Sequence, residues 1–289
     1  MHDSVQPSVA YVEYHGWLEP TGQQRPDSGD IVVYSNIERA SALSPARPGL
    51  CIRYVGRGCE DYRIEDRGLR VREGEVMISP QATGAEIEVR PGERQGTLGL
   101  CVLIAPEVGV DLPWMFGPLV MNSACTPLGS IMSRQVRLFS DPTRRKQEDA
   151  ATLSRQLRAA LPGVTKVVVE QAAAMDAAKP TTRFELVRRA SLAQSYLHSV
   201  VDRSVSLEEL AAAVGASQFQ LLRAFQRCFG DSPAAYHRRL RLNRAVEEAE
   251  RREISLATAA QMFGFADGSS FSHCYRRTFG RSPVWSKAD

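Results

Sequence analysis

The chain has 289 residues, with 36 basic and 33 acidic side chains and 43% hydrophobic residues. This length exceeds the needs of one modest core, so we expect two domains. No run of about 18 apolar residues occurs, so we expect no membrane-spanning helix. The first residues, MHDSVQPSVAYVEYHGW, show no basic segment before an apolar one, so we expect a cytoplasmic protein without a secretion signal.

The cysteines and histidines show no pattern of a metal centre. None of the six cysteines forms a Cys-x-x-Cys pair, and the five histidines lack metal-ligand spacing. Without a secretion signal, the cysteines are expected to be reduced and packed as small apolar residues, with a redox-sensing role for one of them left open. We therefore expect neither a metal nor another cofactor.

Positive charge is concentrated in the last third of the chain. Residues 181–289 hold 16 basic and 11 acidic residues, and 15 of the basic residues are arginines, whereas the remainder holds 20 basic and 22 acidic residues. This asymmetry indicates a polyanionic partner for the C-terminal end, although the surplus is modest.

Residues 31–105 have the composition of short β-strands, after a polar stretch at 1–30 that we expect to be irregular. The expected strands are rich in Val, Ile and Tyr. In chain order they are IVVYS, LCIRYVG, DYRIED, LRVRE, EVMISP, AEIEVR and TLGLCVLIA. Turn residues separate them, and many short strands at this spacing predict a small barrel or sandwich, with or without helices packed on it.

The hydrophobic period changes after about residue 112, and a helical segment is expected from about 145. Leu153, Leu157 and Leu161 recur every four residues and form an apolar stripe on a helix. Gly163 is expected to end this helix, and VTKVVVEQAAAMDAA at 164–178 to form a second one. The stripe has two interpretations, a dimerisation seam or a cover for the sheet.

A repeated pattern organises residues 181–289, where only helices are expected. One copy, SLEELAAAVGASQFQLLRAFQRCFGDSP, begins at Ser206, and the other, SLATAAQMFGFADGSSFSHCYRRTFGRSP, begins at Ser255. Each copy predicts a helix, a sharp turn at Gly215 or Gly264, and a second helix.

Capping and packing residues support both copies. Ser206 with Glu209, and Ser217 with Gln220, form capping boxes that locate two helix starts in the first copy. Side chains that would pack the two helices together recur at matching places, namely Ala211, Leu221 and Phe225 in the first copy and Ala260, Phe271 and Tyr275 in the second. The plan is that of a helix-turn-helix motif, expected at about 206–229 and about 255–279, whose second helix can enter a DNA major groove.

A long helix is expected between the copies, at about 232–251. Ser232 is placed to cap it and Pro233 to occupy its first turn. A helix of about 19 residues is about 28 Å long, and successive major grooves on one face of a duplex lie about 34 Å apart. The helix would therefore hold the two motifs at neighbouring grooves, with the DNA bending if the span falls short.

The outward faces of the second helices carry the residues that we expect to contact DNA: Gln218, Phe219, Leu222, Arg223, Gln226, Arg227, Gly268, Ser269, Ser270, His273, Arg276 and Arg277. Arginine can bond guanine, glutamine can bond adenine, and Phe or Leu can contact a thymine methyl group. Arg227, Arg276 and Arg277 lie nearer the helix ends and are expected at phosphates. Most basic helical hairpins are merely solvated, but two capped copies in register favour DNA binding.

Several stretches carry a family resemblance. They are GFADGSSFSHCYRRTFGRSP at 264–283, LAAAVGAS in the first copy, the L-x-R-x-F core at 221–225, and R-R-L-R-L-x-x-A at 238–245. Over about 185–287 the chain resembles the AraC/XylS family of bacterial transcription regulators. His273 stands where many members have arginine, and Gly268 has no side chain to offer a base, so the second copy is expected to contact fewer bases.

The resemblance implies an α+β fold. Residues 1–180 would form a cupin-like β-barrel with flanking helices that binds an effector and dimerises, and residues 181–289 an all-α DNA-binding domain with two helix-turn-helix motifs joined by a long helix. DYRIEDRGLRVREGEVMISP at 61–80 is similar to a hairpin and strand of those barrels. Residues 31–180 contain no histidine, which argues against the chemistry of metal-dependent cupin enzymes.

The resemblance also implies a sequence-specific regulator, expected to be an activator, that responds to a small molecule and is not an enzyme. Its expected partners are double-stranded DNA, RNA polymerase and a second copy of the chain. Trp17, Tyr54 and Tyr62 are candidates to contact the effector, although core packing is the favoured interpretation for each. The alternatives are a regulator switched by a partner protein, and an enzyme domain fused to a DNA-binding domain, for which no nucleophile or metal cluster is visible.

Overall fold

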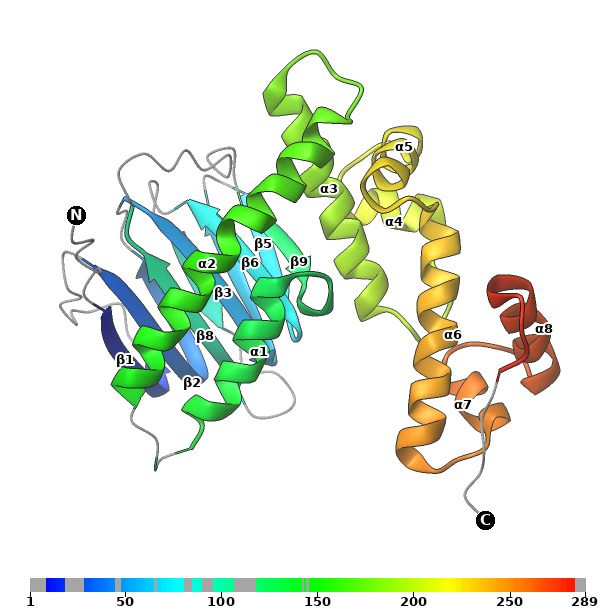
Figure 1. Ribbon diagram of the computed structural model, residues 1–289, viewed down its shortest axis with the longest axis horizontal. Coiled ribbons are helices and arrows are strands. Elements are labelled where there is room, and N and C mark those ends of the chain that lie inside the picture. Colours follow the sequence, from blue (N-terminus) through cyan, green and yellow to red (C-terminus); the bar gives the residue numbers. More distant parts are fainter. Residues whose placement is uncertain are drawn as a thin grey trace, which may run out of the picture. The chain divides into compact units, whose positions relative to one another are not determined.

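The structure is a computed structural model that describes residues 9–18, 29–44, 48–64, 67–80, 85–89, 96–106, 118–141, 143 and 146–283. The chain divides into two compact units, Met1–Ala173 and Ala174–Asp289. The first unit contains the strands and two long helices, and the second unit is helical (Figure 1). The expected domain boundary, residue 180, is the first residue of a helix in the second unit.

A mixed sheet forms most of the first unit. Its nine described strands are β1 (Val9–Leu18), β2 (Asp30–Ser44), β3 (Leu50–Arg57), β4 (Cys59–Ile64), β5 (Arg67–Arg72), β6 (Glu75–Pro80), β7 (Ala85–Val89), β8 (Thr97–Ile104) and β9 (Leu119–Asn122). They follow the order β5-β4-β7-β2-β8-β3-β6-β9, and β1 pairs in parallel with β2. The seven expected strands between 31 and 105 are therefore confirmed as strands.

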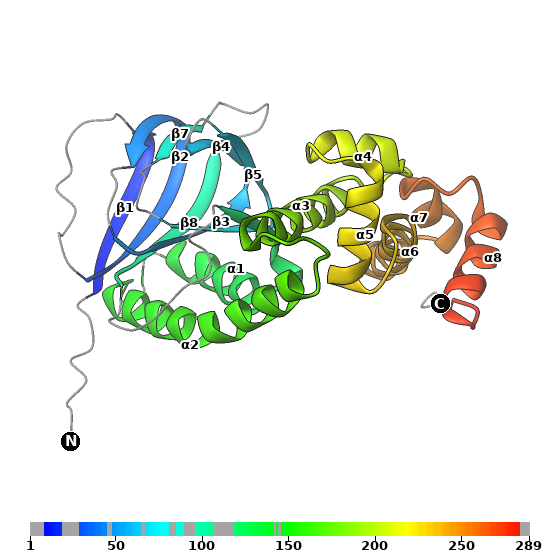
Figure 2. The ribbon, with the colours of Figure 1, turned by 90° about the horizontal axis from the view of Figure 1, so that it is seen from above.

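The sheet bends back on itself. The long strand β2 pairs with β8 over residues 31–37 and with β7 over residues 40–44. Strands β3 and β4 are separated by Gly58 alone, whose φ of +82° lies in the left-handed region that favours glycine. Strand β3 continues along β8 and β6, whereas β4 continues along β7 and β5. Figure 2 shows the curvature of the sheet. Across the bend, Arg53 of β3 donates a hydrogen bond to Glu60 of β4 at 2.6 Å.

Two helices, α1 (Pro127–Phe139) and α2 (Lys146–Ala173), lie on one side of the curved sheet (Figure 2). A short 3-10 helix, η2 (Ser123–Cys125), precedes α1. Phe139 of α1 stacks against Tyr34 of β2 and Tyr11 of β1, with ring centroids 6.4 and 5.1 Å apart. The sheet face that carries Tyr34 is therefore closed by helices.

The expectation that residues 1–30 are irregular is wrong for β1, and neither β9 nor α1 is predicted by the sequence analysis. Strand β1 is secured by pairing with β2 and by the contact of Tyr11 with Phe139 of α1. Both partners are distant in sequence, so the local pattern of β1 carries no sign of them.

The expected break at Gly163 is also wrong, because α2 runs without interruption through Pro162 and Gly163. Proline removes one backbone hydrogen bond, and its cost is smallest where water can satisfy the released carbonyl. Pro162 and Gly163 are both exposed. Leu161 and Val164, on either side, are buried, so packing on this face holds the helix together across the break signal.

The leucine stripe of α2 covers the interior of its own unit. Leu153 and Leu157 are fully buried and Leu161 is 6% exposed in a single chain. The buried carboxylate of Asp30 on β2 fastens the same helix, because it accepts hydrogen bonds from Arg158 at 2.5 and 2.8 Å. Of the two interpretations, these contacts favour the cover, and the assignment of the three leucines to a dimer seam is not supported.

The second unit contains six described helices: α3 (Pro180–Ser199), α4 (Leu207–Ala213), α5 (Gln218–Phe229), α6 (Pro233–Arg252), α7 (Leu256–Met262) and α8 (Gly268–Phe279). They form two apolar cores. The first joins α3, α4 and α5 around Phe225, and the second joins α6, α7 and α8 around Phe271. The two cores position two similar helical pairs, α4–α5 and α7–α8.

Candidate nucleic-acid interface

Local hydrogen bonds build the first helical pair, α4–α5, as the sequence predicts. The hydroxyl of Ser206 accepts a hydrogen bond from the amide of Glu209 at 3.0 Å, and that of Ser217 accepts one from the amide of Gln220 at 3.3 Å. Between the helices, Gly215 has a φ of +65°. These contacts satisfy amides at both helix starts and turn the chain sharply, which fixes the angle between α4 and α5.

The second pair, α7–α8, repeats this construction. Ser255 accepts a hydrogen bond from the amide of Thr258 at 3.1 Å, and Asp267 accepts one from the amide of Ser270 at 2.6 Å. Gly264 has a φ of +71°. The pairs differ at the second cap, where a carboxylate replaces the serine hydroxyl of the first pair, and these backbone hydrogen bonds lower the pKa of Asp267.

The second helix of each pair has one buried face. On α5, Leu221 and Phe225 are 1% and 0% exposed and pack against α3 and α4. On α8, Phe271 and Tyr275 are 0% and 8% exposed and occupy the same places against α6 and α7. Each helix therefore presents its opposite face outward.

The outward faces carry the predicted DNA-contacting residues. On α5, Gln218, Phe219, Arg223, Gln226 and Arg227 are exposed, with Phe219 67% exposed. The exposed residues predicted on α8 are Ser269, Ser270, His273, Arg276 and Arg277. Leu222 and Gly268 are half-buried and lie at the edge of these faces. The Arg223 guanidinium lies 5.3 Å from the centre of the Phe219 ring, so one aromatic and one cationic group form a stacked unit.

Helix α6 connects the two pairs. Ser232 accepts a hydrogen bond from the amide of Ala235 at 3.3 Å, and Pro233 occupies the first turn, as predicted. The helix has 20 residues, which corresponds to a length of about 30 Å. Its Arg241 is 6% exposed and donates hydrogen bonds to the backbone carbonyls at the end of α7. The role of Arg241 is absent from the sequence analysis, because arginine on a helix is usually an exposed residue.

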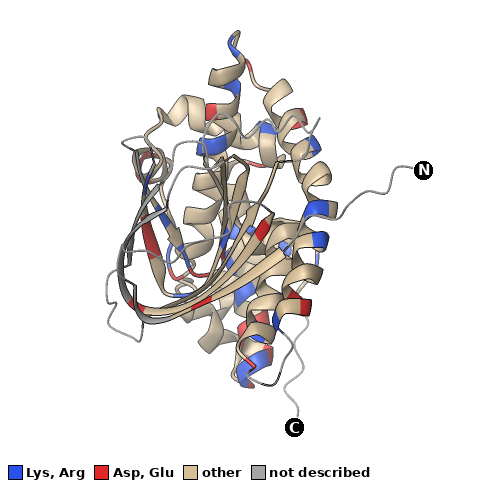
Figure 3. Cartoon of the chain, turned by 90° about the vertical axis from the view of Figure 1, so that its left-hand side faces the viewer, with Lys and Arg blue, Asp and Glu red and all other residues tan. Residues whose placement is uncertain are grey.

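Ion pairs neutralise many arginines of this unit. Figure 3 shows Lys and Arg interspersed with Asp and Glu along the chain as a whole. Arg188 and Arg189 pair with Glu185, and Arg251 and Arg252 pair with Glu248. Burial alone would raise the pKa of Glu185. The hydrogen bonds and charges of Arg188 and Arg189 outweigh burial and lower this pKa to about 2. Fewer arginines are therefore free of an acidic partner than the composition of this unit indicates.

Among the residues that the structure describes, the arginines on the outward face of α5 pair with an acidic side chain, whereas those on the outward face of α8 do not. Within the described part of the chain, no acidic side chain pairs with Arg276 or Arg277 on α8. On α5, Arg223 donates a hydrogen bond to Asp176 at 2.9 Å, and Arg227 lies 3.6 Å from the same carboxylate. Asp176 was not among the predicted site residues, since it is far from α5 in sequence.

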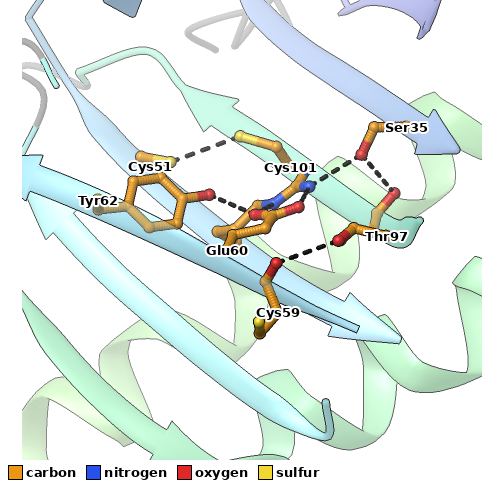
Figure 4. A network of polar contacts seen from close by, with 9 residues as sticks. Ser35, Cys51, Cys59, Glu60, Tyr62, Thr97 and Cys101 are labelled. Atoms are coloured by element: carbon orange, nitrogen blue, oxygen red, sulfur yellow. Dashed lines mark hydrogen bonds and ion pairs between the residues drawn. The ribbon is translucent and has the colours of Figure 1, made fainter. Parts of the chain in front are cut away.

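The candidate ligand residues of the first unit do not form one site. Tyr62 is 5% exposed and its hydroxyl donates to Glu60 at 2.6 Å (Figure 4). Tyr54 is also buried, but it alternates with Arg53 along β3 and faces α1, beside Val136. The side chain of Trp17 lies outside the described residues. Only Tyr62 therefore joins the polar cluster inside the bend of the sheet.

This polar cluster is centred on a buried ion pair between Arg53 and Glu60. Figure 4 labels Glu60 with its neighbours Tyr62 and Ser35. Arg53 also donates to Ser35 at 2.8 Å. Burial and the Glu60 carboxylate raise the pKa of Tyr62 well above its ordinary value. Burial alone would lower the pKa of Arg53, but Glu60 outweighs this and raises it. The cluster is internally neutralised and hydrogen-bonded, which is the condition for burying charge inside a domain.

The thiols of Cys51 and Cys101 border the same cluster, with their sulfur atoms 3.5 Å apart (Figure 4). Among the described residues, no group of three or more His, Cys, Asp or Glu side chains is arranged to hold a metal ion. None of the described helices combines the length and hydropathy that a bilayer span requires.

Two helical pairs with arginine-bearing outward faces, joined by one long helix, are typical of DNA-binding domains. Residues 210–284 match the family model described as "Helix-turn-helix domain". The transcriptional regulator GbdR of Pseudomonas aeruginosa is 37% identical over 83 residues, which are 29% of this chain and 23% of GbdR. The probable transcriptional regulator LumQ of Photobacterium leiognathi is 32% identical over 93 residues, which are 32% of this chain and 38% of LumQ.

A solved regulator from Chromobacterium violaceum, described as containing an AraC-type DNA-binding domain, shares 32% identity. It covers 33% of this chain and 85% of that one, with a TM-score of 0.31. The chain thus spans about a quarter of GbdR and less than half of LumQ. Residues 210–284 therefore form a helix-turn-helix domain, within the stretch 185–287 whose resemblance to AraC/XylS regulators predicts one.

Proposed function

We propose that the protein is a sequence-specific DNA-binding transcriptional regulator, and that α4–α5 and α7–α8 are its two helix-turn-helix motifs. One observation carries this proposal. Leu221 and Phe225 are buried on α5, and Phe271 and Tyr275 are buried at the matching places on α8. Arginines and polar side chains occupy the opposite, exposed face of each helix. The match of residues 210–284 to a helix-turn-helix family supports it.

The two recognition helices have different roles in this proposal. Arg223 of α5 contacts a guanine edge, with Phe219 beside it at a thymine methyl group. Arg227, Arg276 and Arg277 bind phosphates and hold the helices in register. Helix α8 has serines and His273 where α5 has larger side chains, so it contributes less base discrimination and more backbone contact.

Helix α6 sets the distance between the recognition helices. Its length of about 30 Å is slightly less than the about 34 Å between successive major grooves. The two motifs therefore occupy neighbouring grooves on one face of the duplex when the DNA bends toward the protein. Bending a site of this kind costs about 1–6 kcal/mol and depends on the base sequence, which adds discrimination at base pairs without contacts.

The first unit is, in this proposal, a cupin-like sensor that binds a small molecule and makes the protein an activator. In this proposal the effector is bound within the first unit, and Tyr62 of the buried polar cluster is the candidate residue for contacting it. An effector acts only through different affinities for two conformational states. A homodimer that contacts RNA polymerase completes the proposal, with a dimer surface outside the buried leucines of α2.

The DNA-binding proposal is tested with Arg223→Ala in the full chain. Its probes are a duplex selected by the wild-type chain from a random library and a scrambled duplex of equal length. We expect a loss of about 1–3 kcal/mol on the selected duplex, with relaxed preference at one base pair. Arg251→Ala is the control, because Arg251 is exposed and pairs with Glu248 away from α5. Equal losses on both duplexes would show that Arg223 makes no base contact.

The sensor proposal is tested by thermal unfolding of the full chain against a library of polar metabolites. An effector that binds only the folded chain stabilises it by RT ln(1 + c/Kd), where c is the free effector concentration, so the melting temperature rises with this concentration. Tyr62→Phe removes one hydroxyl from the polar cluster and should weaken that shift, whereas Tyr11→Phe, on the helix-facing side, should not. No shift across the library would favour a partner protein as the switching signal.

A further inference from the structure

The connection between α2 and α3 contacts the outward face of α5. Asp176 lies in this connection and belongs to the second unit. It accepts a hydrogen bond from Arg223 at 2.9 Å and lies 3.6 Å from Arg227. These are two of the arginines that the proposed function assigns to DNA, so one carboxylate occupies both.

Backbone contacts hold the connection in this place. Arg227 donates a hydrogen bond to the carbonyl of Ala174 at 2.8 Å, and Arg183 of α3 donates one to the carbonyl of Ala177 at 2.6 Å. The segment around Asp176 is thus tied to α5 on one side and to α3 on the other. Helices α3 and α5 share one apolar core, so both hydrogen bonds attach the segment to the same part of the second unit.

A carboxylate and a nucleic acid compete for the same donors. Guanidinium groups bind carboxylate and phosphate oxygens with the same geometry, and guanine offers a similar pair of acceptors. While Asp176 holds Arg223 and Arg227, those donors are occupied, and its negative charge repels an approaching phosphate. On α8, Arg276 and Arg277 have no acidic partner among the described residues, so the competition is confined to α5.

We propose that the segment 174–177 is an intramolecular competitor of DNA, with Asp176 as its competing group. This inference rests on the proposed function, since it requires α5 to bind DNA. Helix α2 of the first unit ends at Ala173, three residues before Asp176. The competing carboxylate therefore follows α2 directly in the sequence.

The test compares the wild-type full chain with Asp176→Asn, which removes the charge and keeps the side-chain shape. The probe is the duplex selected by the wild-type chain, measured by fluorescence anisotropy at low salt. We expect two- to fivefold tighter binding, the range of an exposed ion pair. Glu247→Gln is the matched control, because Glu247 is similarly exposed, pairs with Arg244 on α6, and changes the net charge equally. It should change the affinity by less than the Asp176 variant.

A second comparison places Asp176→Asn in a chain that already carries Arg223→Ala and Arg227→Ala. Asp176 then has no arginine on α5 to pair with, so we expect Asp176→Asn to leave the affinity for the selected duplex unchanged. The inference is overturned if Asp176→Asn does not increase the affinity of the otherwise wild-type chain for DNA, or if Glu247→Gln increases it equally. It is also overturned if Asp176→Asn increases the affinity as much in the chain without the two arginines. If Arg223→Ala alone leaves binding to the selected duplex unchanged, the proposed function fails instead, which separates the two failures.

Discussion

Arg241 of α6 donates two hydrogen bonds to the backbone carbonyl of Phe263, at 2.9 and 2.6 Å, just past the end of α7. The same guanidinium donates to the carbonyl of Gly264 at 2.8 Å and lies 4.7 Å from the centre of the Phe265 ring. Carbonyls at the end of a helix have no partner within it. Arg241 supplies these partners and so fastens the turn of the second helical pair to the long helix.

We expect Arg241→Ala to destabilise the α7–α8 pair by about 1.5–3 kcal/mol, because the carbonyls of Phe263 and Gly264 lose a charged donor. Arg241→Lys should recover part of this loss, since one ammonium group cannot reproduce the two-pronged contact. Hydrogen exchange of α7 and α8 peptides measures the local opening. Arg239→Ala serves as the control, because Arg239 is half-buried and pairs with Asp231, just before the start of α6. Similar protection in Arg241→Ala and Arg239→Ala would contradict the fastening role.

The two turn glycines should respond unequally to alanine. Both Gly215 and Gly264 are in the left-handed region, where a Cβ atom costs about 1–2 kcal/mol. A Cβ atom on Gly215 would meet nothing within 4 Å, whereas one on Gly264 would overlap the Asp202 carbonyl oxygen and lie 2.8 Å from Arg241. We expect Gly264→Ala to cost about 1–3 kcal/mol more than Gly215→Ala in urea unfolding, because packed backbone must shift. Equal costs would show that the turn is looser than its contacts indicate.

The helical unit should lose stability in mild acid. Burial lowers the pKa of His198 to about 4 from its ordinary value of 6.5, with smaller effects from Arg244 and His237. Between these two values the unfolded chain binds a proton that the folded chain does not, so the free energy of unfolding falls as the pH falls from 6.5 to 4. Urea unfolding at pH 7 and pH 5 should differ by about 1–2 kcal/mol from this group.

The variant His198→Gln removes the titrating ring and should reduce this pH dependence. Part of the dependence should remain, because burial also lowers the pKa of His237, which contacts the Val200 carbonyl at 2.6 Å. His273→Gln changes an exposed histidine of the same unit and provides the comparison. An unchanged pH slope in His198→Gln would locate the effect elsewhere.

Binding to DNA should weaken steeply with salt. Each phosphate neutralised contributes about −0.9 to the slope of log affinity against log salt concentration. Arg276→Ala and Arg277→Ala should each reduce the magnitude of this slope by about one, and should lower affinity equally on selected and scrambled duplexes. A slope unaffected by both changes would remove these arginines from the phosphate contacts.

The helical pairs could be predicted from the sequence because their determinants are local. Ser206, Ser217 and Ser232 cap helices through amides three residues ahead, and Gly215 and Gly264 adopt backbone angles that favour glycine in any surroundings. The strands between 31 and 105 follow from the same kind of short-range pattern. The outward position of Arg223 likewise follows from helical periodicity once Leu221 and Phe225 face inward.

Long-range contacts decided the rest. The pattern at Pro162 and Gly163 predicts a helix end, yet burial of Leu161 and Val164 keeps α2 continuous. The leucine stripe of α2 could pack equally well against a second chain or against the sheet. Only the tertiary structure shows that it faces the interior of its own unit. Local sequence carries no sign that Tyr62 points into the bend of the sheet while Tyr54 faces α1.

The amino-acid sequence by itself determined the two matched helical pairs, their caps and their basic outward faces, because these depend on neighbours within about one helical turn. The tertiary structure alone decided which charged groups meet, as with Arg53 and Glu60 across a bend, Asp30 and Arg158 between sheet and helix, and Asp176 and Arg223 at the connection. An ion pair between distant residues depends on where packing places the two backbones, and a charge alone gives no information about its partner.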